Sequence, residues 1–372
     1  MLNNPGESPW SVQVADSLIK RLKILGTKWD YEWGVALKGI EQVWLATGHD
    51  KYFSYIKENT DSFVLPDGTI RTYKPTEYNI DHINTGKLLF SLAQATNDTR
   101  YTKAIHTLRE QMQTHPRNSE GGYWHKNIYP HQMWLDGIYM AGPFLAQYAK
   151  TMDEPNLFDD VAHQIELIER HTRDPQTGLL FHGWDESREQ KWANPETGCS
   201  PHLWGRAIGW FVMALVDVLD YLPIDHPKRG QLIDIFKQTI DALLRVQGDR
   251  TGLWYQILDL GDRTGNYLEA SASCMVTYSI AKAIRHGYLG QDYRKFAQKA
   301  HAGILEHLVE VDEKNAINLH NICGVAGLGG TPYRDGSYEY YVGEPIVTND
   351  YKGVGPLIMA MVEIERLNLS ND

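Results

Sequence analysis

Apolar residues recur along much of the chain with the three- and four-residue spacing of amphipathic helices. In residues 99–115, for example, Ile105, Leu108 and Met112 fall on one helical face. The same spacing predicts six amphipathic helices, near residues 9–26, 50–64, 99–115, 155–173, 228–247 and 290–310. Each would pack one apolar face inward and leave the other face to water.

A second set of helices alternates with the first and has a different composition, rich in Gly, Ala and aromatic residues. The turns between the sets repeat. Residues 46–52 and 95–101 both begin with Ala-Thr and end with a basic residue followed by Tyr. The second set is expected near residues 31–47, 80–96, 134–150, 204–221, 268–286 and 351–367.

Strict alternation of the two sets in six pairs predicts an all-α fold. We expect a double-ring (α/α)6 helical barrel that forms a single domain over residues 1–372. Small residues such as Gly39, Gly209 and Gly355 in the second set would let backbones approach one another around the axis. An open superhelix of helical pairs is the alternative, but these glycines favour closure.

Composition and charge exclude several classes of partner. The formal net charge is −11, and no block of Lys and Arg stands out, so a nucleic acid is not an expected partner. The longest apolar stretch, residues 209–219, is interrupted by Asp217 and is too short to span a bilayer. We therefore expect no membrane association. No pattern in the sequence predicts an oligomeric state.

The first residues lack the basic and apolar regions of a signal peptide, and the three cysteines, Cys199, Cys274 and Cys323, are widely separated. These features predict a cytoplasmic protein. No CxxC or HExxH motif occurs, and the glycine-rich run 327–330 follows no predicted strand. We accordingly expect no metal and no cofactor.

Aromatic residues are the unusual part of the composition, with 11 Trp and 21 Tyr. Many tryptophans stand beside Gly, Asp, Asn or His: Trp29, Trp124, Trp134, Trp184, Trp192, Trp204 and Trp254. An aromatic face offers apolar area to the C–H face of a sugar ring, so together they suggest a carbohydrate-binding surface. Filling a large core is the alternative role for any one of them.

In such a barrel the inner helices begin at one shared mouth, where polar residues should gather. Acids such as Asp30, Glu269 and Asp350 can simply cap these helices. Asp136 differs, because it is flanked by Trp134 and an apolar helix, surroundings that favour the protonated form of a carboxyl group. A second carboxylate nearby would raise the pKa of Asp136 further. Asp136 is therefore a candidate general acid.

Four segments carry a specific resemblance: residues 120–126, 129–137, 192–201 and 204–210. Through them the chain resembles glycoside hydrolase family 105, the unsaturated rhamnogalacturonyl hydrolases, and more distantly the unsaturated glucuronyl hydrolases. The resemblance implies that Asp136 is the proton donor and Asp81 the second active-site carboxylate. It also implies substrate-binding roles for Tyr31, His125, Lys126, Trp134, His182, Trp204, Arg206 and Trp210. Residues 324–341 align less securely with the family.

The family reaction is hydration of a vinyl ether rather than attack at an anomeric carbon. The implied substrate is a short oligosaccharide with a 4,5-unsaturated uronic acid at its non-reducing end, by default from rhamnogalacturonan in pectin. Arg206, with Lys126 or His125, would neutralise the uronate carboxylate. Two other classes stay open on the residues alone: a sugar epimerase or isomerase using His125 and His182, and a non-catalytic carbohydrate-binding protein.

Overall fold

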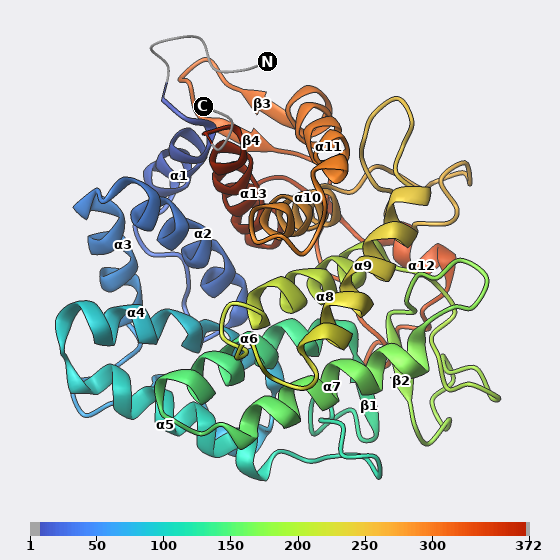
Figure 1. The fold of residues 1–372 in the computed structure, drawn as a ribbon, viewed down its shortest axis with the longest axis horizontal. Coiled ribbons are helices and arrows are strands. Elements are labelled where there is room, and N and C mark those ends of the chain that lie inside the picture. The colour runs from blue at the N-terminus through green and yellow to red at the C-terminus, as the bar shows by residue number, and fades with distance from the viewer. Residues whose placement is uncertain (1–7, 370–372) are drawn as a thin grey trace.

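The computed structural model describes residues 8–369 and contains both predicted sets of helices (Figure 1). The outer set comprises α1 (Trp10–Arg21), α3 (Asp50–Asp61), α5 (Thr99–Thr114), α7 (Asn156–Thr172), α9 (Arg229–Arg245) and α11 (Arg294–His307). The inner set comprises α2 (Tyr31–Thr47), the 3-10 segment η2 (Ile80–Gly86) with α4 (Lys87–Thr96), α6 (Leu135–Thr151), α8 (Gly205–Val218), α10 (Ala270–Arg285) and α13 (Tyr351–Leu369). All twelve predicted helical segments are confirmed.

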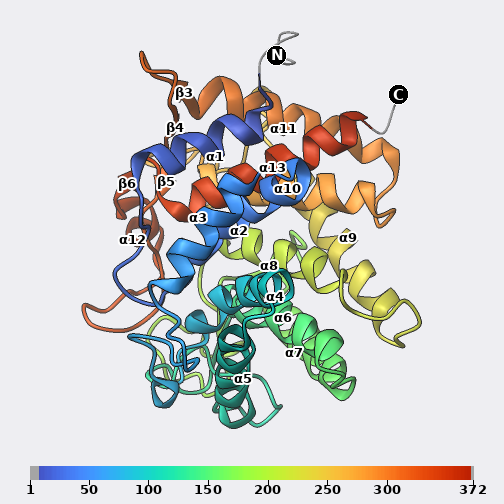
Figure 2. The same ribbon diagram turned by 90° about the vertical axis from the view of Figure 1, so that its left-hand side faces the viewer.

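The inner helices form a closed ring. Each packs against the next along the chain, from α2 and η2 through α6, α8 and α10 to α13, and α13 packs back against α2 (Figures 1 and 2). The open superhelix is therefore excluded, and the (α/α)6 barrel is confirmed.

Two glycines make the closing contact possible. A Cβ atom on Gly39 of α2 would lie 2.9 Å from the carbonyl oxygen of Gly355 in α13. A Cβ atom on Gly355 would lie 2.6 Å from the carbonyl oxygen of Val35. Both distances are too short for a side chain, so only glycine lets these two backbones touch.

The connections hold short elements that helical periodicity could not predict. Three antiparallel pairs occur: β1 (Gln132–Trp134) with β2 (Gly183–Asp185), β3 (Val309–Val311) with β4 (Ile317–Leu319), and β5 (Ile322–Cys323) with β6 (Ile346–Val347). Helix α12 (Tyr338–Gly343) and the 3-10 turns η1 (Pro75–Glu77) and η3 (Gln291–Tyr293) complete the described elements.

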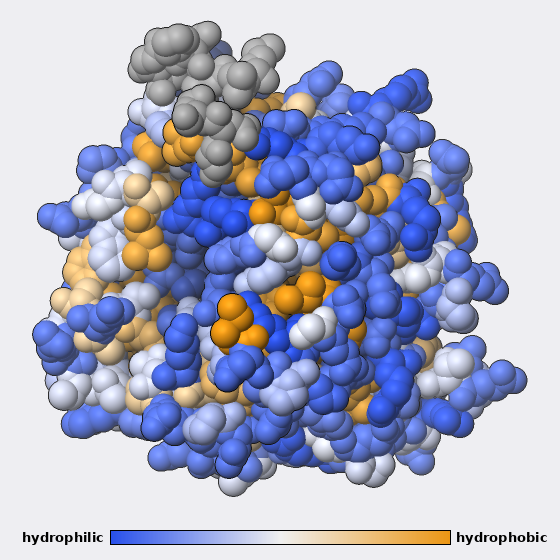
Figure 3. Space-filling model, in the orientation of Figure 1, coloured by the Kyte–Doolittle hydropathy of each residue, from blue (hydrophilic) through white to orange (hydrophobic). Residues whose placement is uncertain are grey.

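Several tryptophans belong to the core rather than to a binding surface. Trp29, Trp204 and Trp254 are almost completely buried, which is the alternative role considered above. The face in Figure 3 is mostly hydrophilic with scattered apolar side chains. No helix among residues 8–369 combines the length and apolar character needed to cross a bilayer.

Candidate active site

A polar pocket lies where the first turns of α2, η2 and α6 meet the loops before them. Six of the ten predicted site residues line it: Tyr31, Asp81, His125, Lys126, Trp134 and Asp136. The other lining residues are Lys28, Asp30, Glu32, Asn79, His82, Tyr129, Met140, Val325, Ala326 and Arg334. No group of three or more His, Cys, Asp or Glu within residues 8–369 is arranged to hold a metal ion.

Asp81 is held as a carboxylate by Lys126. The Lys126 Nζ atom lies 2.6 Å from Asp81 Oδ2, and His125 Nε2 lies 3.5 Å from Oδ1. Burial alone would raise the pKa of Asp81, but the charge of Lys126 and its hydrogen bond outweigh burial and lower this pKa. Asp81 is thus ionised at neutral pH.

His125 is a neutral, stacked ring. Its imidazole lies parallel to the Trp134 indole, with ring centroids 4.3 Å apart. Burial lowers the pKa of His125 to about 4, against the opposing effect of Asp81. His125 therefore carries no charge at neutral pH and cannot neutralise an anionic substrate.

Asp136 lies in the first turn of α6, directly after β1, and its side chain is 14% exposed. The Nε2 atom of His182 lies 3.2 Å from Asp136 Oδ2, although the pair is not aligned as a hydrogen bond. The β1–β2 pairing fixes this approach, because Leu135 N–H donates to the His182 carbonyl at 3.0 Å. On the other side of the imidazole, His182 Nδ1 is hydrogen-bonded to the Tyr341 hydroxyl at 2.7 Å.

The four remaining predicted residues lie behind the pocket lining: His182, Trp204, Arg206 and Trp210. Trp210 supports the pocket floor. Its indole stacks on Tyr139 with centroids 4.8 Å apart and meets the Tyr31 ring edge-on at 6.4 Å. Trp204 packs beside His182, at 4.7 Å between ring centroids.

Arg206 is placed differently from the sequence-based expectation. Its side chain is 1% exposed and lies 3.5 Å from Glu269 Oε1. It donates to Ser271 Oγ at 2.8 Å and to the Cys323 carbonyl. Glu269 also caps α10 by accepting from Ala272 N–H. The guanidinium is thus enclosed in an internal ion pair instead of facing the pocket.

Three residues in or near the pocket were not predicted from the sequence. Arg334 donates to the Tyr129 hydroxyl at 2.7 Å, and its guanidinium lies 5.8 Å from the ring centroids of Tyr129 and Trp134. Tyr129 stacks on Trp134 at 4.9 Å. Tyr129 stands in a segment that carries the family resemblance and could have been found there. Arg334 and Tyr341 lie in the poorly aligned segment 324–341.

Comparison with known proteins identifies the family. The sequence profile of Glycosyl Hydrolase Family 88 matches residues 10–368. The chain belongs to this family. The family assignment does not favour the epimerase or the non-catalytic binding protein, and it agrees with the predicted resemblance to the unsaturated uronyl hydrolases.

Individual known proteins are similar to this chain over most of its length. A family 105 glycoside hydrolase from C. acetobutylicum ATCC 824 is 47% identical, with a TM-score of 0.95 over 96% of this chain and 100% of its own. Unsaturated rhamnogalacturonyl hydrolase YesR of Bacillus subtilis is 30% identical over 80% of this chain and 81% of its own. The unsaturated glucuronyl hydrolase of Bacillus sp. GL1, at 13% identity over 96% of this chain and 95% of its own with a TM-score of 0.72, shares the fold.

Proposed function

We propose that the protein removes a 4,5-unsaturated uronic acid from the non-reducing end of a short oligosaccharide. The observation that carries this proposal is that one pocket holds two carboxyl groups with different neighbours. Asp136 faces the pocket beside a buried imidazole, while Asp81 is kept ionised by Lys126. The family match and the similarity to YesR support the same activity.

The chemistry is hydration of the vinyl ether between C4 and C5. Asp136 donates a proton to C4, which leaves positive charge shared between C5 and the ring oxygen. The ionised Asp81 stabilises this charge. Water then adds at C5 while the Asp136 carboxylate takes its proton, so the acid is regenerated. The resulting hemiketal opens and releases the neighbouring sugar.

We assign the substrate carboxylate to Arg334 instead of Arg206. The charge of Lys126 is already opposed by Asp81, His125 is neutral, and Arg206 is enclosed with Glu269. Arg334 lines the pocket, where the carbonyls of Gly329 and Leu328 and the Tyr129 hydroxyl hold its guanidinium in place. The positive charge of this group would attract a carboxylate. The stacked rings of Tyr129 and Trp134 would cover the sugar beside it.

The neighbouring sugar is proposed to be rhamnose from rhamnogalacturonan, because the YesR match covers most of both chains. Two unsaturated 3S-rhamnoglycuronyl hydrolases match only 42% and 45% of this chain. We also propose that the barrel is one catalytic domain. A cytoplasmic location is part of the proposal, supported by three buried cysteines that form no disulfide.

Isotope labelling tests the proposed reaction. In deuterium oxide, lyase-generated oligosaccharides should gain deuterium at C4, and oxygen from labelled water should enter at C5. The ultraviolet absorbance of the double bond should disappear in step with release of the next sugar. A saturated uronoside is the control and should not react. Label at the anomeric carbon, or turnover of the control, would indicate an ordinary two-carboxylate glycosidase instead.

A further inference from the structure

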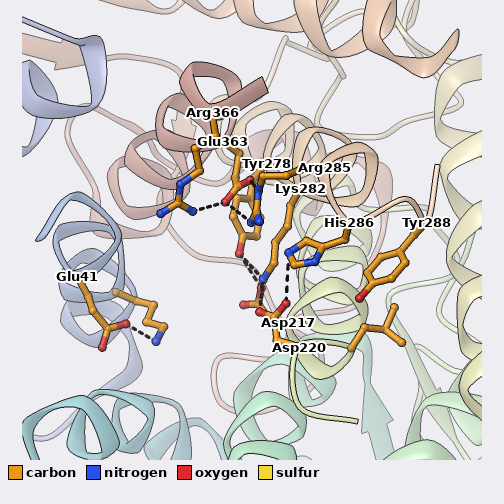
Figure 4. Close-up of polar contacts among 12 residues, drawn as sticks. Glu41, Asp217, Asp220, Tyr278, Lys282, Arg285, His286, Tyr288, Glu363 and Arg366 are labelled. Atoms are coloured by element: carbon orange, nitrogen blue, oxygen red, sulfur yellow. Dashed lines mark hydrogen bonds and ion pairs between the residues drawn. The ribbon is translucent and has the colours of Figure 1, made fainter. Parts of the chain in front are cut away.

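The candidate active site lies at the end of the barrel where the inner helices begin. Its floor is backed by the stacked rings of Tyr139 and Trp210, both almost completely buried. Near the C-terminal ends of α8 and α10, the buried Lys282 ammonium lies 2.7 Å from Asp217 Oδ1 and also pairs with Asp220 (Figure 4). An oligosaccharide whose first sugar is bound in the pocket must therefore extend outward through the mouth, where its second sugar would lie.

The mouth of the pocket combines charged and apolar side chains. Lys28 and Glu32, at the start of α2, line the pocket with side chains that are 70% and 40% exposed. Val325 and Ala326 line it from the connection that follows β5. Val325 is 52% exposed, whereas Met140, which is also apolar and lines the pocket, is only 1% exposed. Val325 is thus an aliphatic side chain at the mouth, in the region that the second sugar would occupy.

Hydrogen bonds on both sides of Val325 restrain its backbone. Gly324 N–H donates to the Pro345 carbonyl at 2.7 Å, and Gly327 N–H donates to the Tyr340 hydroxyl at 3.0 Å. The residues just before Gly324 form β5, which pairs with β6. Because the backbone is held in this way, the Val325 isopropyl group stays at the mouth, and a ligand that covers it gains the free energy of removing apolar surface from water.

We propose that Val325 is a specificity-determining residue, which selects a 6-deoxy sugar such as rhamnose as the second sugar. The inference rests on the proposed function, because it takes the first sugar to be the unsaturated uronic acid. A 6-deoxy sugar carries a methyl group where a hexose carries a hydroxymethyl group, and this methyl group would pack against the Val325 isopropyl group. The extra hydroxyl of a hexose would lose water there without a hydrogen-bond partner on the Val325 side chain. Hydroxyl groups elsewhere on the sugar can donate to the Glu32 carboxylate.

Two synthetic disaccharides that differ by one hydroxyl group test the proposal. Both carry the same 4,5-unsaturated uronic acid, linked to rhamnose in one case and to the 6-hydroxy analogue of rhamnose in the other. The loss of the ultraviolet absorbance of the double bond gives kcat/KM for each compound. We expect the unmodified protein to prefer the rhamnose compound about tenfold, the order of discrimination that an apolar contact achieves for one added hydroxyl group.

Two variants of Val325 connect this preference with the side chain. Val325→Thr keeps the shape and adds a hydroxyl group that can bond to the hexose, so the preference should fall to about twofold or less. Val325→Ala removes most of the apolar contact and should lower the preference to a similar extent. Val311→Thr is the matched control and should keep the preference of the unmodified protein, since Val311 of β3 is 50% exposed and lies outside the pocket lining.

The proposal is overturned if the unmodified protein consumes both disaccharides with equal kcat/KM. It is also overturned if Val325→Thr and Val325→Ala keep the full preference for the rhamnose compound. These results would leave the proposed function intact, because the double bond is still consumed. If the unmodified protein consumes neither disaccharide, the proposed function itself is refuted, and the role of Val325 with it.

Discussion

His182 lies between Asp136 and Tyr341. Its Nε2 atom is 3.2 Å from the carboxylate, and its Nδ1 atom shares a 2.7 Å hydrogen bond with the phenol. The three residues come from the start of α6, the loop before β2, and helix α12. The orientation of the His182 imidazole beside the candidate acid is thus set by a residue 159 positions further along the chain.

Replacing Asp136 with Asn should abolish most turnover while leaving the pocket intact. The amide keeps the shape of the side chain but cannot donate the proton, and general acid catalysis contributes about 10²–10⁴-fold. We expect kcat to fall by about this factor, with Kd for the substrate within about threefold of the unmodified protein. Single-turnover kinetics and calorimetry measure the two quantities. A rate near that of the unmodified protein would assign the proton to another residue.

Tyr341→Phe should act through His182. Losing the phenol hydroxyl leaves His182 Nδ1 without its partner, so the imidazole can turn away from Asp136. We expect kcat to fall about tenfold, KM to change little, and the pH profile of kcat to shift. Tyr338→Phe is the control in the same helix, since its hydroxyl bonds to the carbonyls of Arg263 and Thr264. An equal loss of kcat in both variants would mean that α12 is merely destabilised.

Lys126→Met should change the pH dependence of catalysis. The Lys126 charge opposes the effect of burial on Asp81, so its removal raises the pKa of Asp81. A higher pH is then needed to ionise this carboxyl group, and the acidic limb of the kcat/KM profile should move to higher pH. Lys126→Arg keeps the charge and should move the limb much less. An unmoved limb in Lys126→Met would show that catalysis does not need ionised Asp81.

Arg334→Gln should weaken substrate binding. It also removes hydrogen bonds to the Gly329 and Leu328 carbonyls, so the melting temperature is measured beside KM. If its guanidinium binds the uronate, KM should rise about tenfold or more, because a charge-assisted hydrogen bond contributes about 1.5–3 kcal/mol. The Tyr129 and Trp134 rings beside it keep their stacking. Steady-state kinetics measure this change. An unchanged KM would mean that another group binds the substrate carboxylate.

Arg206→Gln should lower the stability of the protein and leave substrate binding nearly unchanged. It leaves Glu269 buried without its ion-pair partner, a change that typically costs about 3–5 kcal/mol of folding stability. We expect a large fall in melting temperature and, where the variant is folded, a nearly unchanged KM. A raised KM with a normal melting temperature would instead restore the substrate-binding role expected from the sequence.

The helices could be predicted because their signal is local. Spacings of three and four residues identify an amphipathic helix, and alternation with glycine-rich helices identifies the barrel. Asp81 and Asp136 could be placed at its mouth because both stand at the start of inner helices. The ion pair between Asp81 and Lys126 was not predicted, since no sequence pattern shows that the Lys126 ammonium lies 2.6 Å from the Asp81 carboxylate.

Arg206 and Arg334 show what could not be predicted from the sequence. Arg206 stands in a strongly recognisable segment, but its partner Glu269 is 63 residues away, so the sequence did not reveal that the charge is already balanced. Arg334 lies in an irregular connection without periodicity, where nothing local indicates which way a side chain will point. Both assignments depend on tertiary contacts between distant segments.

The contact between Gly39 and Gly355 also bears on the order in which the barrel can form during synthesis. Helix α13 is the sixth inner helix, and it leaves the ribosome after the five others. Until then the α2 backbone that it covers has no neighbour on that side, and the ring has a gap. Lys352 of α13 also pairs with Glu32 at the pocket, 2.7 Å away. Glu32, which lines the pocket, therefore gains this ion-pair partner only when α13 has docked onto α2.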